Sequence, residues 1–403
     1  MIIRSLLDTD QYIFTMAQAI LHQCPAAKAK FKFKCRNGSA IPKGADPEKF
    51  LSLLNKELDH LCELRLRNLE LSYLSHIRYF KQDFIEILRL LKLNRDYIHA
   101  YLDKDKELQV EAEGPLFFII WFEVPVLATI SQLNTQLSGT MEFESIKTGK
   151  ELLERKVSYL KSNLHNDSKF LFADFGTRRR YHYEWHKTVL EYLKREASDW
   201  FIGTSNVHFA MELALKPIGT MAHLWFQAFQ RMGFQLAKSQ QAALSAWVEE
   251  YQGDLGIALS DIGGFDWFLK DFNLFYAKLF DGCRHDSGDP FWWADKLITH
   301  YEKLGINPLT KSAVFSDGLS IPLAVKLYHT FNRRINTSFG IGTNLTNDMG
   351  FKALQIVMKM VECNGGPVSK RSDSSGKGMC EDPEFDAYFG KVIKEEIANG
   401  SNL

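Results

Sequence analysis

The stretch from Arg284 to Pro290 reads Arg-His-Asp-Ser-Gly-Asp-Pro and combines a guanidinium, two carboxylates, a hydroxyl and a glycine. An arginine offers a fork of donors to phosphate or carboxylate groups. Aspartates pair well with sugar hydroxyls or a divalent cation, and a glycine lets the backbone approach a ligand closely. The stretch is therefore typical of a loop that binds a phosphorylated sugar, with a helix that begins at the proline. The alternative is an Arg–Asp ion pair that braces a turn.

His223 is a second candidate for chemistry. It ends the sequence Thr220-Met-Ala-His223 and comes directly before an apolar stretch that predicts a helix. A neutral imidazole is both a nucleophile and a proton carrier. A single histidine at a helix start is more often a capping or core residue, so its function depends on which groups lie near it. The other eleven histidines show no H-x-x-x-H spacing, and we therefore expect no structural zinc.

Phe175 and Arg178 flank the dipeptide Gly176-Thr177. A phenyl face and a guanidinium plane at this spacing can hold a flat heteroaromatic ring between them. The run Arg178 to Arg180 can also hold a small carboxylate. The alternative is a solvated basic helix start, which would oppose the helix dipole. That unfavourable interaction favours an anionic ligand.

The sequence Phe339-Gly340-Ile-Gly342-Thr343 follows an apolar strand late in the chain. Bare backbone N–H groups in such a turn can surround a phosphate, and late loops of barrel proteins often hold one. Gly-x-Gly alone is only a tight turn, but its position after a strand favours binding.

These candidate residues follow short apolar segments that alternate with helical ones. We expect strands within residues 169–175, 200–206, 218–223, 255–261, 312–318 and 335–343, with one long helix from 223 through 250. Apolar strands that alternate with helices predict a parallel sheet covered on its faces. Polar residues at successive carboxyl ends predict a site built from the loops of a TIM-type barrel. Only about six such units are evident, so the barrel is expected to be irregular or incomplete.

The first third of the chain predicts an α+β domain. Asp8, Thr9 and Asp10 are good residues for a helix start, and Asp10 and Tyr12 can point into a site that holds a ring-shaped ligand. Lys28–Arg36 alternates as an edge strand with a solvated charged face. Further helices are expected at 46–64 and 83–93, and further strands at 97–102 and 108–112. The apolar run 116–122 suits either a buried strand or a helix start.

Composition excludes several classes of protein. Lys plus Arg and Asp plus Glu both number 49, so there is no charge excess of the kind that binds nucleic acid or an acidic membrane. The longest apolar run, 116–122, is much shorter than the roughly 20 residues that span a bilayer. The N-terminus has no secretory signal pattern, and the six cysteines form no C-x-x-C pair. These features predict a cytoplasmic protein with free thiols.

The motifs together resemble those of the nicotinate phosphoribosyltransferase family, a group of type II phosphoribosyltransferases, and the likeness runs over essentially the whole chain. The segments that carry it are 5–12 (SLLDTDQY), 31–36 (FKFKCR), 174–180 (DFGTRRR), 203–206 (GTSN), 219–226 (GTMAHLWF), 284–290 (RHDSGDP), 315–317 (FSD), 338–343 (SFGIGT) and 361–365 (VECNG).

The resemblance implies an α/β protein: an irregular barrel with an N-terminal α+β domain that also takes the C-terminal segment. The corresponding boundaries are 1–140, 141–355 and 356–403. It also implies a homodimer, in which Tyr12 of the partner subunit stacks on or near the substrate ring.

The implied reaction joins nicotinate to phosphoribosyl pyrophosphate (PRPP) and yields nicotinate mononucleotide and pyrophosphate, for NAD biosynthesis. ATP hydrolysis is coupled to it through a phosphohistidine, which places the enzyme in the ATP-dependent ligase class. Mg²⁺ and ATP are the implied cofactors, and no nucleic acid or membrane partner is expected.

The resemblance also assigns roles to residues. His223 is the phosphorylated histidine, and Arg284 and Asp286 share the catalytic role. Nicotinate binds to Tyr12, Phe175, Arg178 and Ser205. PRPP binds to Asp261, Arg284, Asp286, Ser287, Asp317, Gly318, Gly340, Gly342 and Thr343. Metal ligands are unknown.

Two details of the pattern bear on substrate and affinity. Ser205 stands where similar nicotinamide-using enzymes have an acidic residue, and a serine does not repel a carboxylate, which favours nicotinate over nicotinamide. Asn344 stands where a basic residue is common in the family, which predicts weaker phosphate binding.

Three alternatives remain. Quinolinate phosphoribosyltransferase shares the superfold but should lack His223 and be shorter. A catalytically silent pyridine- or PRPP-binding regulator is the second. A barrel aldolase of sugar phosphates is the third, but no lysine lies at a strand end for a Schiff base.

Overall fold

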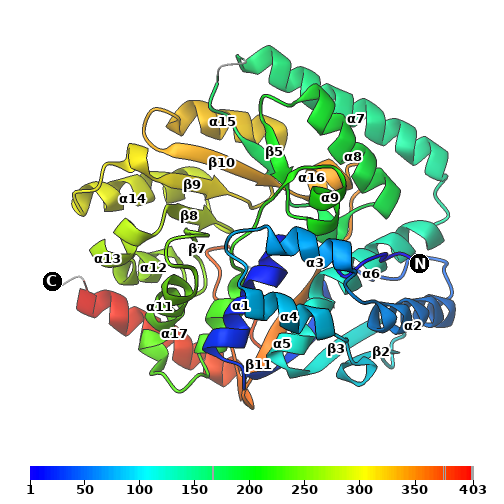
Figure 1. Ribbon diagram of the computed structural model, residues 1–403, viewed down its shortest axis with the longest axis horizontal. Coiled ribbons are helices and arrows are strands. Elements are labelled where there is room, and N and C mark those ends of the chain that lie inside the picture. The colour runs from blue at the N-terminus through cyan, green and yellow to red at the C-terminus, as the bar shows by residue number, and fades with distance from the viewer. Residues whose placement is uncertain (166–167, 375, 377, 401–403) are drawn as a thin grey trace.

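The computed structural model describes residues 1–165, 168–374, 376 and 378–400. Its larger sheet has seven parallel strands in the order β6-β5-β4-β10-β9-β8-β7. The strands are β4 (Phe172–Asp174), β5 (Phe201–Thr204), β6 (Lys216–Pro217), β7 (Ile257–Leu259), β8 (Gly282–His285), β9 (Ser312–Phe315) and β10 (Asn336–Ile341). Consecutive strands are neighbours, and β10 returns to β4, so the sheet curls into a barrel (Figure 1). This confirms the predicted incomplete barrel.

The barrel is open between β6 and β7, which do not pair in the sheet. β6 ends at Pro217 and the next helix begins at His223, so the strand expected at 218–223 is wrong. Instead, the Thr220 hydroxyl donates to the Ile257 carbonyl at 3.0 Å and links the two sides of the opening. A side chain therefore replaces the backbone ladder at this point.

Helices surround the barrel and confirm the alternating pattern. They are α7 (Glu142–Asn163), α8 (Tyr183–Glu196), α9 (Val207–Glu212), α10 (His223–Phe229), α11 (Ser239–Tyr251), α12 (Phe265–Asp271), α13 (Leu274–Leu279), α14 (Pro290–Lys303), α15 (Ile321–Phe331) and α16 (Thr343–Thr346). The single helix expected from 223 through 250 is wrong, because α10 ends at Phe229 and a turn with Gly233 (φ 82°) separates it from α11. Pro290 begins α14 as predicted.

The smaller sheet is antiparallel, in the order β12-β11-β1-β3-β2. Its strands are β1 (Lys28–Cys35), β2 (Ile98–Leu102), β3 (Leu108–Pro115), β11 (Ile356–Cys363) and β12 (Gly366–Pro367). The helices of this part are α1 (Gln11–Gln23), α2 (Pro47–Glu63), α3 (Asn68–Ser75), α4 (Gln82–Leu90), α5 (Leu116–Ile119), α6 (Glu123–Leu137) and, after the last strand, α17 (Pro383–Gly400). In Figure 1 the orange strand β11 lies among blue and cyan elements, so the end of the chain completes the N-terminal sheet.

The prediction that residues 28–36 form an edge strand is wrong, because β1 lies inside the sheet between β3 and β11. Its lysines are not simply solvated. Lys30 pairs with Glu111 at 3.0 Å and Lys32 with Glu381 at 2.6 Å. Ion pairs to charges on or near the neighbouring strand satisfy a pattern that sequence alone assigns to an exposed edge.

The apolar run 116–122 begins a helical segment, which decides between the two alternatives left open. Leu116–Leu137 is the one segment of the described chain whose length and composition suit a membrane span, and 89% of its most apolar window is buried inside the protein. Trp121 and Phe14 meet there in an edge-to-face contact at 4.9 Å. This segment therefore forms part of the core.

The N-terminal segment is fastened to the barrel by a buried ion pair. Both guanidinium ends of Arg180 bond Asp8 at 2.7 Å, and neither side chain is exposed. Asn206, at the end of β5, donates to the same carboxylate at 2.8 Å. These bonds place the start of α1 over the carboxyl ends of the barrel strands. The division of the chain at residues 140 and 355 stays a prediction.

Candidate active site

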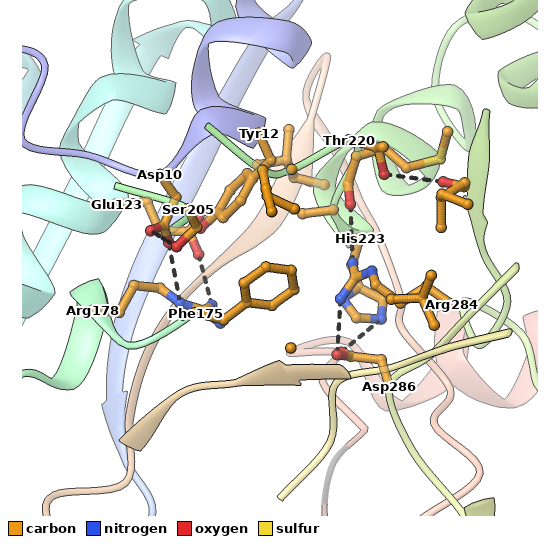
Figure 2. A pocket seen from close by; sticks show the side chains of 18 of the residues that line it. Asp10, Tyr12, Glu123, Phe175, Arg178, Ser205, Thr220, His223, Arg284 and Asp286 are labelled. Carbon is orange, nitrogen blue, oxygen red and sulfur yellow. Dashed lines mark hydrogen bonds and ion pairs between the residues drawn. The ribbon is translucent and has the colours of Figure 1, made fainter. Parts of the chain in front are cut away.

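A cavity of about 290 Å³ lies between the carboxyl ends of the barrel strands and the antiparallel sheet. Barrel residues from Phe175 to Gly340 form one side, and Phe31, Met358 and Met360 of the other sheet face them. Figure 2 shows two groups of side chains in it, an aromatic group around Arg178 and a polar group around His223. Both predicted ends of the site therefore belong to one space.

Arg178 lies at the aromatic end. It follows β4 in a short 3-10 helix, and its guanidinium lies 6.0 Å from the centre of the Tyr12 ring. Its nearest acidic groups are Asp10 at 3.9 Å and Glu123 at 3.6 Å. Both contacts are too long for strong hydrogen bonds. The guanidinium therefore keeps donors for an anionic ligand.

Asp10 and Ser205 lie together beside Arg178. The Ser205 hydroxyl donates to Asp10 Oδ1 at 2.7 Å, and the Gln11 amide donates to the Ser205 carbonyl at 2.7 Å. Asp10 is predicted to start the helix. It does occupy the N-cap position directly before α1, but its side chain makes no capping hydrogen bond. Burial raises the pKa of Asp10. A carboxyl group that is easier to protonate repels a neighbouring carboxylate less.

Tyr12 lines the cavity of its own chain. Helix α1 brings the ring to the cavity wall (Figure 2). The stacking of Tyr12 of the partner subunit on or near the substrate ring stays a prediction. Burial, and then the Glu123 carboxylate, raise the pKa of Tyr12 well above its usual value. The neutral phenol is the form that can stack on a substrate ring.

Phe175 packs directly on the late glycine turn. A Cβ on Gly340 would lie 2.3 Å from the Phe175 ring, and one on Gly342 would lie 2.9 Å from the Phe175 carbonyl oxygen. These two glycines therefore give space to the aromatic end of the site. Their predicted role in holding a phosphate stays a prediction.

His223 begins α10 at the polar end of the cavity. Its Nε2 lies 2.7 Å from Asp261 Oδ1 and 3.7 Å from Asp286 Oδ2. Burial, and then the positive charge of Lys370, lower the pKa of His223. The imidazole is therefore neutral near pH 7, with a proton on Nε2 for Asp261 and a lone pair on Nδ1.

Arg284 and Asp286 lie beside this histidine at the end of β8. Arg284 donates to Asp286 Oδ1 at 3.0 Å, to Ser316 Oγ at 3.1 Å and to the Met221 carbonyl at 2.9 Å. Burial opposes ionisation of Asp286, but Arg284 and His223 outweigh it and lower its pKa. Both charges are therefore present at neutral pH, held by fixed partners.

Asp261 lies behind His223 and does not line the cavity. Its Oδ2 accepts from Ser287 Oγ at 2.6 Å and pairs with Lys370 Nζ at 3.0 Å. Both carboxylate oxygens are thus engaged by protein groups. Asp261 and Ser287 were predicted as PRPP ligands; neither lines this cavity, and their role in PRPP binding stays a prediction.

The other predicted residues divide in the same way. Asp317, Gly318, Gly342 and Thr343 follow β9 and β10 but do not line the cavity. Of the three consecutive arginines, only Arg178 does so. Arg180 is buried against Asp8, and Arg179 donates to the Ile356 carbonyl at 3.0 Å. Of this run, only Arg178 is therefore placed to hold a small carboxylate in the cavity, and that role stays a prediction.

Three charged residues in or beside the cavity were not predicted from the sequence. Glu123 of α6 and Lys359 of β11 line the cavity, and Lys370 supports Asp261. Lys359 makes no ion pair or hydrogen bond with any described residue, and burial lowers its pKa to about 8 although Glu123 opposes this. The one available signal was a lysine between the apolar residues Met358 and Met360. It is weak because such a lysine is common in half-buried strands.

Comparisons with known proteins agree with this geometry. The model of the "Nicotinate phosphoribosyltransferase (NAPRTase) family" matches residues 170–397, and that of its N-terminal domain matches residues 7–131. A nicotinate phosphoribosyltransferase of Xanthomonas axonopodis pv. citri is 48% identical over 395 residues, which are 98% of each chain. One from Acinetobacter baumannii is 48% identical over 398 residues, also 98% of each chain.

Solved structures give the same result. The nicotinate phosphoribosyltransferase of Vibrio cholerae superimposes with a TM-score of 0.91 at 37% identity, over 98% of this chain and 94% of that one. A putative nicotinate phosphoribosyltransferase of Saccharomyces cerevisiae gives 0.85 at 28% identity, over 98% of both chains. Sequence and fold together show that the chain belongs to the nicotinate phosphoribosyltransferase family.

Proposed function

We propose that the protein transfers the phosphoribosyl group of PRPP to nicotinate, coupled to ATP through phosphorylation of His223. The observation that carries this proposal is the single cavity with an aromatic, arginine-bearing end and a polar end with a neutral histidine. Membership in the family supports the same reaction. The product would serve NAD biosynthesis.

The aromatic end suits nicotinate. Phe175 and Tyr12 offer flat faces for the pyridine ring, and Arg178 offers guanidinium donors for its carboxylate. Ser205 already donates to Asp10, so no additional acidic side chain at this position repels the substrate. An aspartate at position 205 would face Asp10 directly and add a second negative charge.

The polar end suits the ribose and pyrophosphate of PRPP. The pyridine nitrogen attacks the anomeric carbon, the C1–O bond to pyrophosphate breaks, and the bonding pair leaves with pyrophosphate. Arg284 is held by three acceptors and supplies fixed positive charge for the departing group. Preorganised charge of this kind stabilises a transition state without reorganisation. Phe175 and Arg178 orient the nucleophile.

Of the possible metal ligands near His223, one residue has an oxygen atom left to bind Mg²⁺. Ligand atoms of His223, Asp261 and Asp286 lie within 4.8 Å of one another, but both oxygens of Asp261 are engaged. Among the described residues, Asp286 Oδ2 has no closer ion-pair or hydrogen-bond partner than His223 at 3.7 Å. Mg²⁺ is commonly held by one or two carboxylates with substrate phosphates, so Asp286 would hold it. When bound, Mg²⁺ would neutralise charge on the pyrophosphate.

His223 suits the coupling to ATP. Its neutral imidazole can attack the γ-phosphorus, so that an N–P bond forms, the bond from phosphorus to the β,γ-bridging oxygen breaks, and ADP leaves. Water later takes the phosphoryl group and releases phosphate. The overall equation is nicotinate + PRPP + ATP + H₂O to nicotinate mononucleotide + pyrophosphate + ADP + phosphate.

The test is His223→Ala, with His329→Ala as control because His329 is exposed and lies on α15. With [γ-³²P]ATP, we expect acid-labile label on the wild type and on His329→Ala and none on His223→Ala. Nicotinate mononucleotide formation should respond to ATP in the first two proteins only. Label and ATP response in His223→Ala would overturn the assignment.

The same assay separates the alternatives. Product from quinolinate in place of nicotinate would favour quinolinate phosphoribosyltransferase, and no product from either acid would favour a silent binding protein. The homodimer and the cytoplasmic location stay predictions, and the first is tested by light scattering.

A further inference from the structure

A segment near the C-terminus crosses the loops behind the candidate active site. Residues 368–374, here the C-terminal strap, follow β12. The Arg371 amide donates to the Ile262 carbonyl at 2.8 Å, and the Gly288 amide donates to Ser374 Oγ at 2.9 Å. The Asp373 carboxylate accepts from the Phe265 amide at 3.1 Å. The strap therefore joins the loops that follow β7 and β8.

Lys370 is the residue of the strap that reaches toward the active site. Its side chain is buried and its ammonium lies 3.0 Å from Asp261 Oδ2. Ser287 donates to the same oxygen at 2.6 Å and itself accepts from the Asp373 amide at 3.1 Å. One oxygen of Asp261 is thus held by two donors that both depend on the strap.

The other oxygen of Asp261 meets His223. His223 Nε2 lies 2.7 Å from Asp261 Oδ1, whereas Nδ1 makes no hydrogen bond with any described residue. A carboxylate with a fixed plane accepts the proton of the imidazole nitrogen that faces it and so selects one tautomer. If Asp261 turned about its Cβ–Cγ bond, this selection would be lost.

We propose that Lys370 is a positioning residue: it fixes the Asp261 carboxylate so that His223 keeps its proton on Nε2 and presents the lone pair of Nδ1 for phosphorylation. This inference rests on the proposed function only for the phosphorylation step. The tautomer of His223 is a property of the protein without substrate and is measured separately.

The C-terminal strap is held in place by contacts that do not involve the Lys370 side chain. The backbone of Lys370 pairs with Met379 in both directions, at 3.0 Å and 2.9 Å. Ser369 is held independently by Gln230 at 2.9 Å. We therefore expect Lys370→Met, which keeps the length of the side chain, to fold with the strap in place.

The experiment compares Lys370→Met with Lys391→Met, an exposed lysine on α17 that serves as the matched control. The proteins carry ¹⁵N-labelled histidine rings, and the His223 signals are identified by their loss in His223→Ala. We expect wild type and Lys391→Met to show a protonated Nε2 and a pyridine-like Nδ1. Lys370→Met should lose this pattern and label with [γ-³²P]ATP about 10- to 100-fold more slowly, as is typical when a supporting residue is removed.

A second readout separates positioning from general damage. Lys370 does not line the cavity, so nicotinate binding in Lys370→Met should stay within about twofold of wild type, a range expected for a residue without ligand contact. Lys370→Arg should restore part of the labelling rate, because the charge is retained.

Each outcome decides the proposal. A proton on Nδ1 in the wild type overturns it, even if Lys370→Met proves unstable. An unchanged His223 spectrum and labelling rate in folded Lys370→Met also overturn it. If the wild type shows the expected tautomer but never takes label, the proposed ATP coupling fails while the positioning of His223 stands.

Discussion

Lys359 shows how a single unpaired charge links stability to function. Lys359 is half-buried. An ammonium with no partner among the described residues destabilises the folded protein, yet it suits a cavity proposed to bind anionic substrates. Glu123, Arg178, Lys370 and Asp286 are the charged groups that act on it. Functional sites commonly keep such unfavourable charges.

We expect Lys359→Met to stabilise the protein and weaken substrate binding. The pKa shift from 10.5 to about 8 corresponds to at most about 3 kcal/mol, and partial exposure lowers the expected gain at pH 7 to about 1–2 kcal/mol. Between pH 8 and 10.5 the unfolded wild type binds more protons than the folded one, so wild-type stability rises with pH. Urea denaturation should therefore show an advantage of the variant that shrinks from pH 8 to 10. A lower stability of Lys359→Met at pH 7 would contradict this.

Gly340 matters because it leaves room for the Phe175 ring. In Gly340→Ala the new methyl group would lie 2.3 Å from the Phe175 ring. The Phe175 side chain must therefore leave its position in the aromatic end of the cavity. We expect nicotinate KM to rise about 10-fold or more, since misplaced positioning residues have effects of this size. Steady-state kinetics test this. Gly305→Ala is the control for backbone strain without a steric clash, because its φ is 68° and its Cβ meets no atom within 4 Å. An unchanged KM would mean that Phe175 does not hold the ring.

At the scale of elements, the Asp8–Arg180 pair fixes how α1 meets the barrel. The start of α1 carries Asp10 and Tyr12 into the cavity, and β5 carries Ser205. The pair and Asn206 are among the buried contacts that hold these elements in register, together with the bonds between Ser205 and the start of α1. The geometry of the aromatic end of the cavity therefore depends on the Asp8–Arg180 ion pair, which lies outside the cavity.

We expect Arg180→Met to lower the free energy of unfolding by about 3–5 kcal/mol, because it leaves the Asp8 charge buried and unpaired. Burial raises the pKa of Asp8, but Arg180 outweighs it and lowers the pKa below 3.8. The contribution of the pair is therefore complete above about pH 4 and is lost as pH falls through the folded-state pKa. Arg195→Met, at an exposed arginine, should change stability by less than about 0.5 kcal/mol.

The double variant Asp8→Asn/Arg180→Met checks the cause. Removing both charges should be less damaging than removing Arg180 alone, because no unpaired charge remains. Urea titrations of the wild type, Arg180→Met, Arg195→Met and the double variant at pH 7 and pH 4 give the comparison. Equal stability of the single and double variants would show that lost packing, and not charge, explains the effect.

At the scale of the whole molecule, the cavity lies between two sheets that differ in sequence position and in type. Barrel strands form one side and β1 and β11 the other. A ligand in this space touches both sheets and should stabilise both, because binding to the folded state alone shifts the unfolding equilibrium.

Hydrogen exchange tests this coupling. With nicotinate and PRPP near saturation, we expect slower exchange in residues 28–35 and 356–363 as well as in 336–343. At 100 times Kd the stabilisation is about 2.7 kcal/mol. The strand β2, which lies at the far edge of the smaller sheet, is the internal reference. Protection confined to the barrel would mean that the antiparallel sheet does not contact the substrates.

The sequence by itself determined the barrel and its catalytic candidates. Apolar strands that alternate with helices and end in polar residues are local patterns, so β4, β5, β7, β9 and β10 were predicted near their true positions. β8 (Gly282–His285) was not predicted, because the stretch from Arg284 was expected to be a loop. Arg284 and Asp286 were found from the residue types of their own stretch, and His223 from its position before an apolar helix. Phe175, Arg178, Asp10 and Tyr12 were also proposed from local residue types, and the resemblance added Ser205 and the assignment of roles.

Only the tertiary structure decided how the charges are paired and which surfaces enclose the cavity. Lys28–Arg36 looks like an edge strand because its partner β11 lies at the other end of the chain. Lys359 and Lys370 lie on segments that no local pattern connects with His223. Whether a charge is buried, paired or free depends on residues far away in sequence, and the chain brings those together only when it folds.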